Sequence, residues 1–232
     1  MKRNAMQDLI QWKSSEDRKP LVLKGARQVG KTWLMKEFGK KYYNSFVYFN
    51  FDETEELKSV FETSKEPQRI IELLSLIAGE KILPGKTLIV FDEIQECPNA
   101  LNALKYFYEK AGDYHVIAAG SLLGTLLAQP KSYPVGMVNL LPLYPMTFDE
   151  FLTAGGQDAL LAARRQAATQ KPLPLPLHQK LISLFRTYMM VGGMPEVVGR
   201  WVESKDYLQC QMVQDDILVS YEDDFEIGRA HV

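Results

Sequence analysis

The chain has 232 residues, of which 27 are Lys or Arg and 29 are Asp or Glu, so its formal charge is −2. Apolar residues make up 46% and charged residues 24%, an ordinary globular composition that excludes disordered, collagenous and coiled-coil proteins. The length exceeds the usual domain size of about 100 to 150 residues, so we expect one full domain and a smaller second one.

Several function classes find no support in the composition. The balanced charge offers no electrostatic case for binding nucleic acid, although a local basic patch is compatible with it. No stretch approaches the roughly 18 uninterrupted apolar residues of a membrane span, and no apolar run follows the basic start. Two distant cysteines, Cys97 and Cys210, form neither a disulfide framework nor a metal site, which favours the reducing cytoplasm.

Hydrophobic periodicity and turn residues predict alternating helices and short strands over the first 141 residues. The expected helices cover residues 5–13, 33–38 with a stop at Gly39, 53–63, 68–78 and 99–110. The expected strands cover residues 21–23, 46–51, 87–91, 114–119 and, more weakly, 135–141. Since strands alternate with helices and the third strand is continuously apolar, we expect an α/β fold with a mostly parallel sheet covered on both faces.

The alternation ends beyond Tyr144. Residues 148–153, 158–169 and the segment from His178 onward read as helices, and Gly192-Gly193-Met194-Pro195 interrupts the last of them. Residues 171–176 alternate with proline and read as an extended linker. We therefore expect a first domain over 1–170 and a helical C-terminal region over 171–226. Residues 227–232 match a translated sequencing adapter, so we expect an artefactual tail, with a genuine flexible terminus as the alternative.

A phosphate-binding loop is the strongest motif in the chain. It fits G-x-x-x-x-G-K-[ST] between an expected strand and an expected helix. The backbone N–H groups of such a loop and the helix N-terminus form a cradle for phosphates, the lysine approaches the terminal phosphates, and the hydroxyl binds Mg²⁺. The residues of the motif are Gly25, Ala26, Arg27, Gln28, Val29, Gly30, Lys31 and Thr32.

A pair of acids follows the third expected strand directly. Asp92 is predicted to hold Mg²⁺ through its water shell, and Glu93 to orient or deprotonate the attacking water. The loop backbone and the Lys31 ammonium must then face these two acids across a gap wide enough for a magnesium triphosphate, so Lys31 and Asp92 must lie at the same edge of the sheet. Ordinary turn residues are the alternative for the two acids.

Other polar residues near the expected strand ends have two interpretations each. Ser121 follows the fourth strand, where it could hydrogen-bond the γ-phosphate or the attacking water, or simply cap a helix over residues 122–127. Gln95 and Asn50 are weaker candidates that fit loop and strand-end structure. The Arg27 side chain could face the nucleotide, although loop geometry favours solvent.

These motifs resemble the prokaryotic P-loop ATPases of the AAA superfamily, STAND-like, whose C-terminal half is a domain of unknown function. The matching stretches are residues 23–32, 90–95, 118–124, 143–151 and 192–196, in the family's order. The resemblance implies an additional strand, residues 46–51, between the two nucleotide motifs and a strand order of five-one-four-three-two. It also implies a C-terminal domain longer than the one present, so the chain looks truncated.

The resemblance further implies ATP binding and hydrolysis, with Ser121 in a sensor position and Pro195 in a lid element that approaches adenine. A Gly-Gly-x-Pro turn between helices is the alternative for the latter. Such ATPases commonly use an arginine from a neighbouring subunit, and Arg164, Arg165 and Arg186 are all available here.

We therefore expect a Mg²⁺-dependent ATPase in which Lys31, Glu93 and Ser121 act in catalysis and nucleotide state moves the C-terminal region. A nucleotide-gated binding module for a protein or DNA partner, with little turnover, is the main alternative. An inert fragment of a longer ATPase, a P-loop kinase and a helicase are further alternatives, although no arginine-rich lid, second motor core or basic stripe supports the last two. Association into a homo-oligomer stays open, and no membrane partner is expected.

Overall fold

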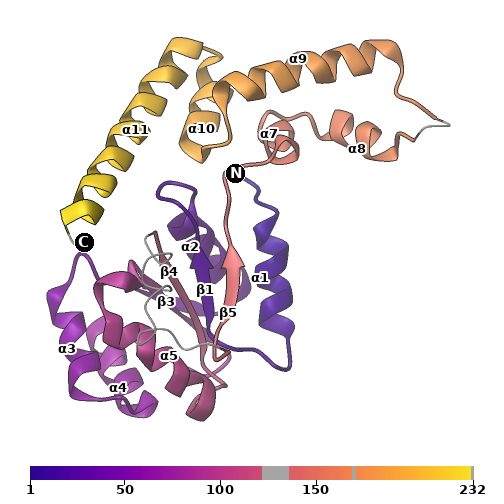
Figure 1. Ribbon diagram of the computed structural model, residues 1–232. Helices are drawn as coiled ribbons and strands as arrows, with labels where there is room; N and C mark the ends of the chain where they lie inside the picture. The colour runs from indigo at the N-terminus through magenta and orange to yellow at the C-terminus, as the bar shows by residue number, and fades with distance from the viewer. Residues whose placement is uncertain (122–135, 169–170, 231–232) are drawn as a thin grey trace. The chain divides into compact units, whose positions relative to one another are not determined.

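The computed structural model describes residues 1–121, 136–168 and 171–230 of the chain (Figure 1). Five parallel strands form one sheet in the order β2-β3-β4-β1-β5. They are β1 (Leu21–Lys24), β2 (Ser45–Asn50), β3 (Thr87–Asp92), β4 (His115–Gly120) and β5 (Asn139–Pro142). The α/β class and the expected strand order are confirmed, because β2 lies beside β3 at the edge and β1 lies between β4 and β5.

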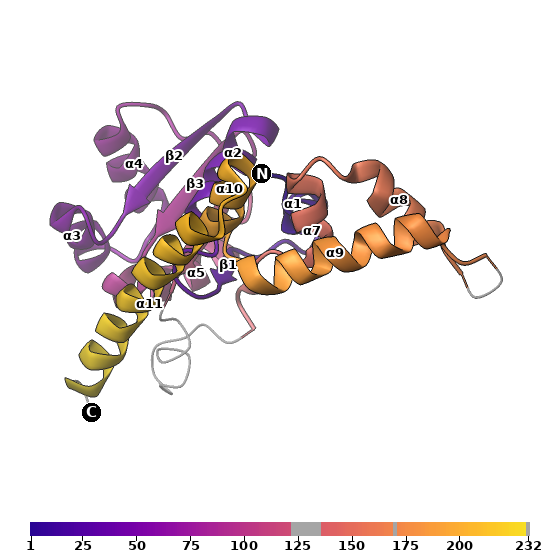
Figure 2. The ribbon, with the colours of Figure 1, turned by 90° about the horizontal axis from the view of Figure 1, so that it is seen from above.

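Helices cover both faces of this sheet (Figures 1 and 2). The helices α3 (Glu55–Thr63), α4 (Pro67–Ala78) and α5 (Pro98–Lys110) pack on one face, and α1 (Ala5–Ser14) and α2 (Lys31–Tyr42) lie on the other. A short 3₁₀ helix, η1 (Ile94–Glu96), joins β3 to α5. Alternate residues of a strand point to opposite faces, so Phe49 of β2 enters the α3–α5 core while Phe46 faces α2.

The central strands are apolar on both faces because both faces are covered. All six residues of β3 and of β4 are buried, as expected for strands inside a parallel sheet. An aromatic cluster anchors the end of β3, where the Phe91 ring lies 5.6 Å from those of Phe51 and Phe61 and 6.4 Å from that of Phe107. The residue after Phe91 is Asp92, so the core holds the strand end that carries the predicted acids.

The sequence prediction that α2 stops at Gly39 is wrong. The helix continues to Tyr42, and Gly39 lies inside it. A β-carbon on Gly39 would come within 2.7 Å of the Phe46 ring, so glycine is required there by packing between α2 and β2.

The C-terminal helices are α7 (Phe148–Ala154), α8 (Asp158–Gln166), α9 (Leu175–Val191), α10 (Pro195–Ser204) and α11 (Tyr207–Ala230). A capping box starts α7: the Thr147 hydroxyl accepts from the Glu150 amide, and the Glu150 carboxylate accepts from the Thr147 amide. The expected linker over residues 171–176 is too long, because α9 already begins at Leu175. Pro176 is tolerated there, since the first turn of a helix leaves its N–H groups unpaired.

The chain divides into two compact units. One contains Ala5–Ala26 and Gly30–Leu143, and the other contains Met1–Asn4, Arg27–Val29 and Tyr144–Val232. This division falls at residues 143 and 144, whereas the sequence analysis placed a domain boundary between residues 170 and 171. Among the described residues, no helix is both long and apolar enough to cross a lipid bilayer.

Candidate functional site

The predicted phosphate-binding loop connects β1 to α2, as the motif requires. Two residues of the loop adopt left-handed backbone conformations, Gln28 with φ of 62° and Gly30 with φ of 91°. Gly30 is the N-cap of α2, and its carbonyl accepts the first helical hydrogen bond from the Leu34 amide at 3.0 Å. The positive end of the α2 dipole therefore lies at Gly30 and Lys31, inside the motif, and it favours an anion at this point.

Lys31 is almost completely buried, with 6% of its surface exposed. Its Nζ donates to the carbonyl oxygens of Gly25 at 2.9 Å and Ala26 at 2.8 Å. A buried ammonium requires such acceptors because desolvation of an isolated charge is costly. The loop thus curls around its own lysine, and both ends of the motif are held together.

Thr32 and Asp92 meet at the carboxyl edge of the sheet. The Thr32 hydroxyl donates to Asp92 Oδ2 at 2.5 Å, although 60 residues separate the two in the sequence. Asp92 is 2% exposed, and its Oδ1 accepts from the Glu93 amide at 3.1 Å. The two residues predicted to hold Mg²⁺ are therefore adjacent, and Lys31 shares their edge of the sheet.

Tyr48 is a residue of this site that the sequence analysis missed. Its hydroxyl donates to the same Asp92 Oδ2 at 2.9 Å, and Lys36 Nζ lies 3.6 Å from the centre of its ring. Burial, followed by the nearby Asp92 carboxylate, raises the pKa of Tyr48, so the hydroxyl stays protonated and donates. The sequence carries no local signal for this contact, because it depends on the register in which Asn50 of β2 pairs with Asp92 of β3. Tyr48 lies two residues before Asn50, so the two side chains share a face of the sheet.

Glu93 is held in a strained backbone conformation. Its φ of 48° and ψ of 46° lie in the left-handed region, which residues with a β-carbon rarely adopt. Its Oε2 accepts from Gln95 Nε2 at 2.6 Å and from the Ser121 hydroxyl at 3.2 Å. Ser121 follows β4, the neighbour of β3, so the parallel sheet brings these two predicted residues together. The helix expected over residues 122–127 lies outside the described residues.

The weaker candidates separate into two groups. Gln95 contacts Glu93 and belongs to the site, whereas Asn50 Oδ1 accepts from the Asp52 amide in a local turn. The side chains of Arg27 and Gln28 are exposed, and Gln28 Nε2 lies 3.3 Å from the Ser220 hydroxyl.

Pro195 lies in a turn with a clear packing function. It occupies the first position of α10, and the preceding Gly193 packs against the backbone of Met146, whose amide donates to the Gly193 carbonyl at 2.6 Å. A β-carbon has no room at Gly193. A contribution of Pro195 to nucleotide binding stays a prediction.

Two of the three candidate arginines pair within their own unit. Arg164 and Arg165 both form ion pairs with Asp149, the second at 3.0 Å. An arginine engaged in this way must leave its carboxylate partner before it can act elsewhere.

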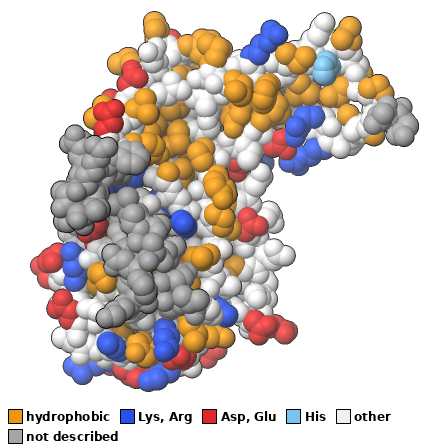
Figure 3. Space-filling view, viewed as in Figure 1, with side chains coloured by type: hydrophobic (Ala, Val, Ile, Leu, Met, Phe, Trp, Pro, Cys, Tyr) orange, Lys and Arg blue, Asp and Glu red, His pale blue; other side chains and the backbone are white. Residues whose placement is uncertain are grey.

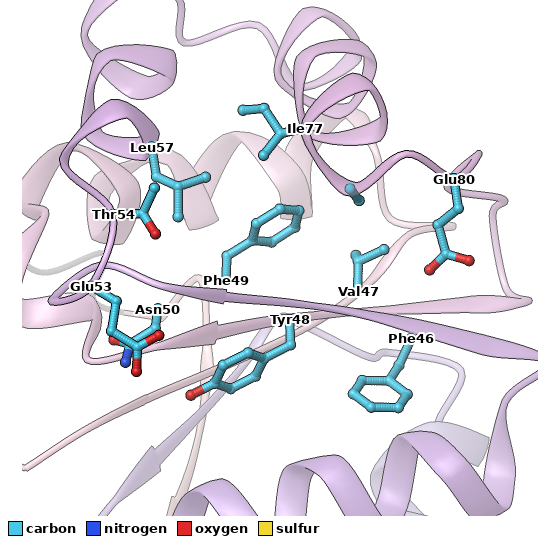
Figure 4. Close-up of a pocket in the computed structure, with 11 residues that line it drawn as sticks. Phe46, Val47, Tyr48, Phe49, Asn50, Glu53, Thr54, Leu57, Ile77 and Glu80 are labelled. Atoms are coloured by element: carbon cyan, nitrogen blue, oxygen red, sulfur yellow. The ribbon is translucent and has the colours of Figure 1, made fainter.

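A hollow of about 310 Å³ follows the sheet edge at β2 (Figure 4). Phe49, Leu57 and Ile77 line its apolar side, and Glu53 and Glu80 add negative charge, with no Lys or Arg among its lining residues. A polyphosphate is repelled by such a lining. The lining of this hollow therefore does not favour a polyphosphate, and the β1–α2 loop remains the predicted phosphate site.

The chain was compared with protein-family models, with curated protein sequences and with solved structures. No curated protein sequence matches the chain significantly. Among solved structures, a Caenorhabditis elegans PCH-2 structure has 13% identity and a TM-score of 0.47 over 94% of this chain. A Drosophila ORC structure bound to DNA has 16% identity and a TM-score of 0.48 over 93%, and an Aeropyrum pernix ORC1 structure in complex with DNA has 14% and 0.39 over 82%. The chain spans 65 to 66% of the length of these three chains.

A protein-family model described as an AAA domain matches residues 17–152, more than half of the chain. The matched segment contains the whole β1–α2 loop, the acids after β3 and Ser121. The chain therefore belongs to the AAA domain family and carries the P-loop core of an AAA-type ATPase.

Proposed function

We propose that this protein binds ATP with Mg²⁺ at the β1–α2 loop and hydrolyses the bond between the β- and γ-phosphates. The observation that carries the proposal is the 2.5 Å hydrogen bond from Thr32 to Asp92, which joins the phosphate-binding loop to the acids after β3. A hydroxyl and a carboxylate so close together, beside a buried lysine, provide the oxygen donors and the positive charge that a metal-bound triphosphate requires.

The donor chemistry of Thr32 and Asp92 fits Mg²⁺, which takes oxygen ligands and keeps several waters. Within the described residues no group of three or more His, Cys, Asp or Glu side chains is arranged to hold a metal ion. When bound, Mg²⁺ neutralises charge that develops on the phosphates. Tyr48 helps to keep the Asp92 carboxylate oriented toward Thr32, because the Tyr48 hydroxyl donates a hydrogen bond to it.

The loop residues bind the phosphates, and the residues around Glu93 carry out proton transfer. The N–H groups of residues 25–32 cradle the phosphates, and the Lys31 ammonium moves from the loop carbonyls to the terminal phosphates. Glu93 accepts a proton from the attacking water, and Gln95 and Ser121 hold its carboxylate in place. Catalysis in this arrangement is mainly positioning and charge stabilisation.

Phosphate release by the full chain, measured alongside direct ATP binding, tests the proposal. Lys31→Ala is expected to abolish tight ATP binding, with Lys65→Ala as the control because Lys65 is exposed. Glu93→Gln is expected to retain binding and to lower turnover at least 100-fold, the lower range for loss of a general base. Glu96→Gln makes the same charge change at an exposed position three residues away and is expected to leave turnover unchanged.

The same measurements separate hydrolysis from the alternative, a nucleotide-gated binding module. A parent protein that binds ATP without turnover supports the binding module. Turnover of Glu93→Gln at the parental rate shows that Glu93 is not the base.

We further infer that nucleotide state acts on the C-terminal helices, as a STAND-like ATPase requires. Large apolar side chains are exposed on α9 and α11 (Figure 3), among them Phe185, Met189, Leu208 and Met212. Exposed apolar surface of this kind favours contact with another protein or a second copy of the chain. Light scattering with and without ATP tests self-association, and phosphate release with and without double-stranded DNA tests a DNA partner.

A further inference from the structure

Arg3 is a buried arginine in which each of the three guanidinium nitrogens donates a hydrogen bond. It is 8% exposed, and its Nε donates to Glu150 Oε1 at 3.1 Å. Its Nη1 donates to the Val29 carbonyl at 2.7 Å, and its Nη2 donates to the Tyr144 carbonyl at 2.5 Å. The four residues belong to one compact unit, so the contacts lie within it. Arg3 thus joins the phosphate-binding loop to the start of the C-terminal helices.

The carboxylate partner of Arg3 is itself rigidly held. Glu150 is 5% exposed, and its Oε1 also accepts from the Asn4 amide at 2.7 Å. Its Oε2 accepts from the Thr147 amide at 2.8 Å in the capping box of α7. The carboxylate cannot rotate without losing these bonds. It therefore holds the planar guanidinium group of Arg3 in one orientation and also balances its positive charge.

The bond to Val29 has a consequence for the phosphate cradle. A trans peptide is planar, with its C=O and N–H pointing in opposite directions. The Val29 carbonyl belongs to the same peptide as the Gly30 amide, so a donor on the carbonyl side determines which way the amide points. The nearby positive charge also polarises this peptide and makes the amide a stronger donor. Gly30 has φ of 91°, a conformation glycine adopts easily, so the backbone by itself does not prevent rotation of this peptide.

We propose that Arg3 is a positioning residue for nucleotide binding: through the Val29 carbonyl it orients the Gly30 amide toward the triphosphate, and through Glu150 it links that orientation to α7. The proposal rests on the proposed function, because it assigns the cradle to a nucleotide phosphate. Arg3 acts through the backbone of the loop and does not itself contact the nucleotide.

Substitutions of the full chain separate this positioning from a general contribution to folding. Glu150→Gln keeps an oxygen that can accept from Arg3 and keeps the Arg3 side chain that donates to Val29, but it removes the charge that pairs with the guanidinium. The double variant Arg3→Met with Glu150→Gln removes the bond to Val29 while avoiding an unpaired buried charge, so it is expected to fold. Arg3→Lys keeps the charge without the fork. Arg18→Met is the matched control, because Arg18 also donates to two backbone carbonyls, those of Lys13 and Gly112.

Two measurements are made on each variant: MgATP affinity by titration, and the amide chemical shift and hydrogen-exchange rate of Gly30 without nucleotide. The double variant and Arg3→Lys are expected to bind MgATP at least tenfold more weakly than the parent and to exchange the Gly30 amide faster. Arg18→Met is expected to stay within twofold of the parent in both measurements, and Glu150→Gln, which keeps Arg3 and its bond to Val29, is expected to lie between the parent and the double variant.

Equal loss of affinity in Glu150→Gln and the double variant overturns the proposal, as does an unchanged Gly30 amide in the double variant. Failure of the parent to bind MgATP refutes the proposed function instead. The Gly30 measurement needs no nucleotide, so it still decides whether Arg3 orients this peptide.

Discussion

Acidification is expected to destabilise this protein through His115, the first residue of β4. This residue is 6% exposed, and its Nδ1 lies 2.6 Å from the Tyr43 hydroxyl, with which it shares a hydrogen bond. The Trp12 ring lies 6.0 Å away, centre to centre. Burial, with smaller contributions from Arg18 and Lys13, lowers the pKa of His115 from 6.5 to about 4. The folded protein therefore keeps the ring neutral in mildly acidic solution.

The direction of the effect follows from proton uptake by the unfolded chain. Below pH 6.5 the unfolded chain binds a proton at His115 that the folded protein does not bind, so the free energy of unfolding falls as pH falls. The free energy of unfolding is unaffected by the titration of His115 well above pH 6.5, falls as the pH drops below 6.5, and stops falling near pH 4, where the folded protein also binds the proton. A pKa difference of this size corresponds to at most about 3.4 kcal/mol, which we reduce to about 2 to 3 kcal/mol for solvent screening.

Urea unfolding followed by circular dichroism between pH 7.5 and 4.5 measures this effect. Carboxylates also titrate in this range, so the informative quantity is the difference between the parent and His115→Asn, which keeps an acceptor for Tyr43 but does not titrate. That difference is expected to change by about 2 to 3 kcal/mol across the range. His178→Asn is the control, since His178 is exposed, and it is expected to follow the parent. A parent-to-His115→Asn difference that is the same at every pH refutes the reasoning.

Three further substitutions test the packing that supports the site, each by urea unfolding. Phe91→Ala is expected to lower the free energy of unfolding by about 3 to 5 kcal/mol, because it opens a cavity in the aromatic cluster before Asp92. Gly39→Ala is expected to destabilise by about 1 to 3 kcal/mol through its clash with Phe46, less the roughly 0.5 to 1 kcal/mol by which alanine favours a helix. Tyr48→Phe is expected to cost about 1 kcal/mol and to weaken MgATP binding, since Asp92 loses a donor that orients it.

Matched controls make these three predictions specific. Phe185→Ala removes a phenylalanine that is 46% exposed, Gly112→Ala adds a methyl group with no heavy atom closer than 3.7 Å, and Tyr144→Phe removes the hydroxyl of a tyrosine that is 68% exposed. The glycine and tyrosine controls are expected to change the free energy of unfolding by less than about 0.5 kcal/mol. Phe185→Ala is expected to cost about 1 kcal/mol, because it loses an edge-on ring contact with Phe148, and this is still well below the cost of Phe91→Ala. If a control lowers the free energy of unfolding as much as the variant it is paired with, the buried contacts at the named site do not explain the loss of stability.

Local patterns in the sequence determined the elements and the nucleotide motif. The glycine spacing of residues 25–32 predicts a phosphate-binding loop wherever it joins a strand to a helix, and β1 and α2 flank it here. Asp92 ends β3 and Glu93 follows it, Ser121 follows the neighbouring β4, and parallel strands bring their carboxyl ends to one edge. These inferences succeed because strand and helix periodicity, together with strand direction, depend on residues close in sequence.

The tertiary structure alone decided which distant side chains support those motifs. Tyr48 meets Asp92 because β2 pairs with β3 in one register, and position 39 requires glycine because Phe46 packs against it. Arg3 and Glu150 are 147 residues apart and lie in different helical or loop segments, so no pattern in the nearby sequence predicts their ion pair. Burial makes such contacts strong and specific, and burial of a side chain depends on every element packed around it, which no short stretch of sequence contains.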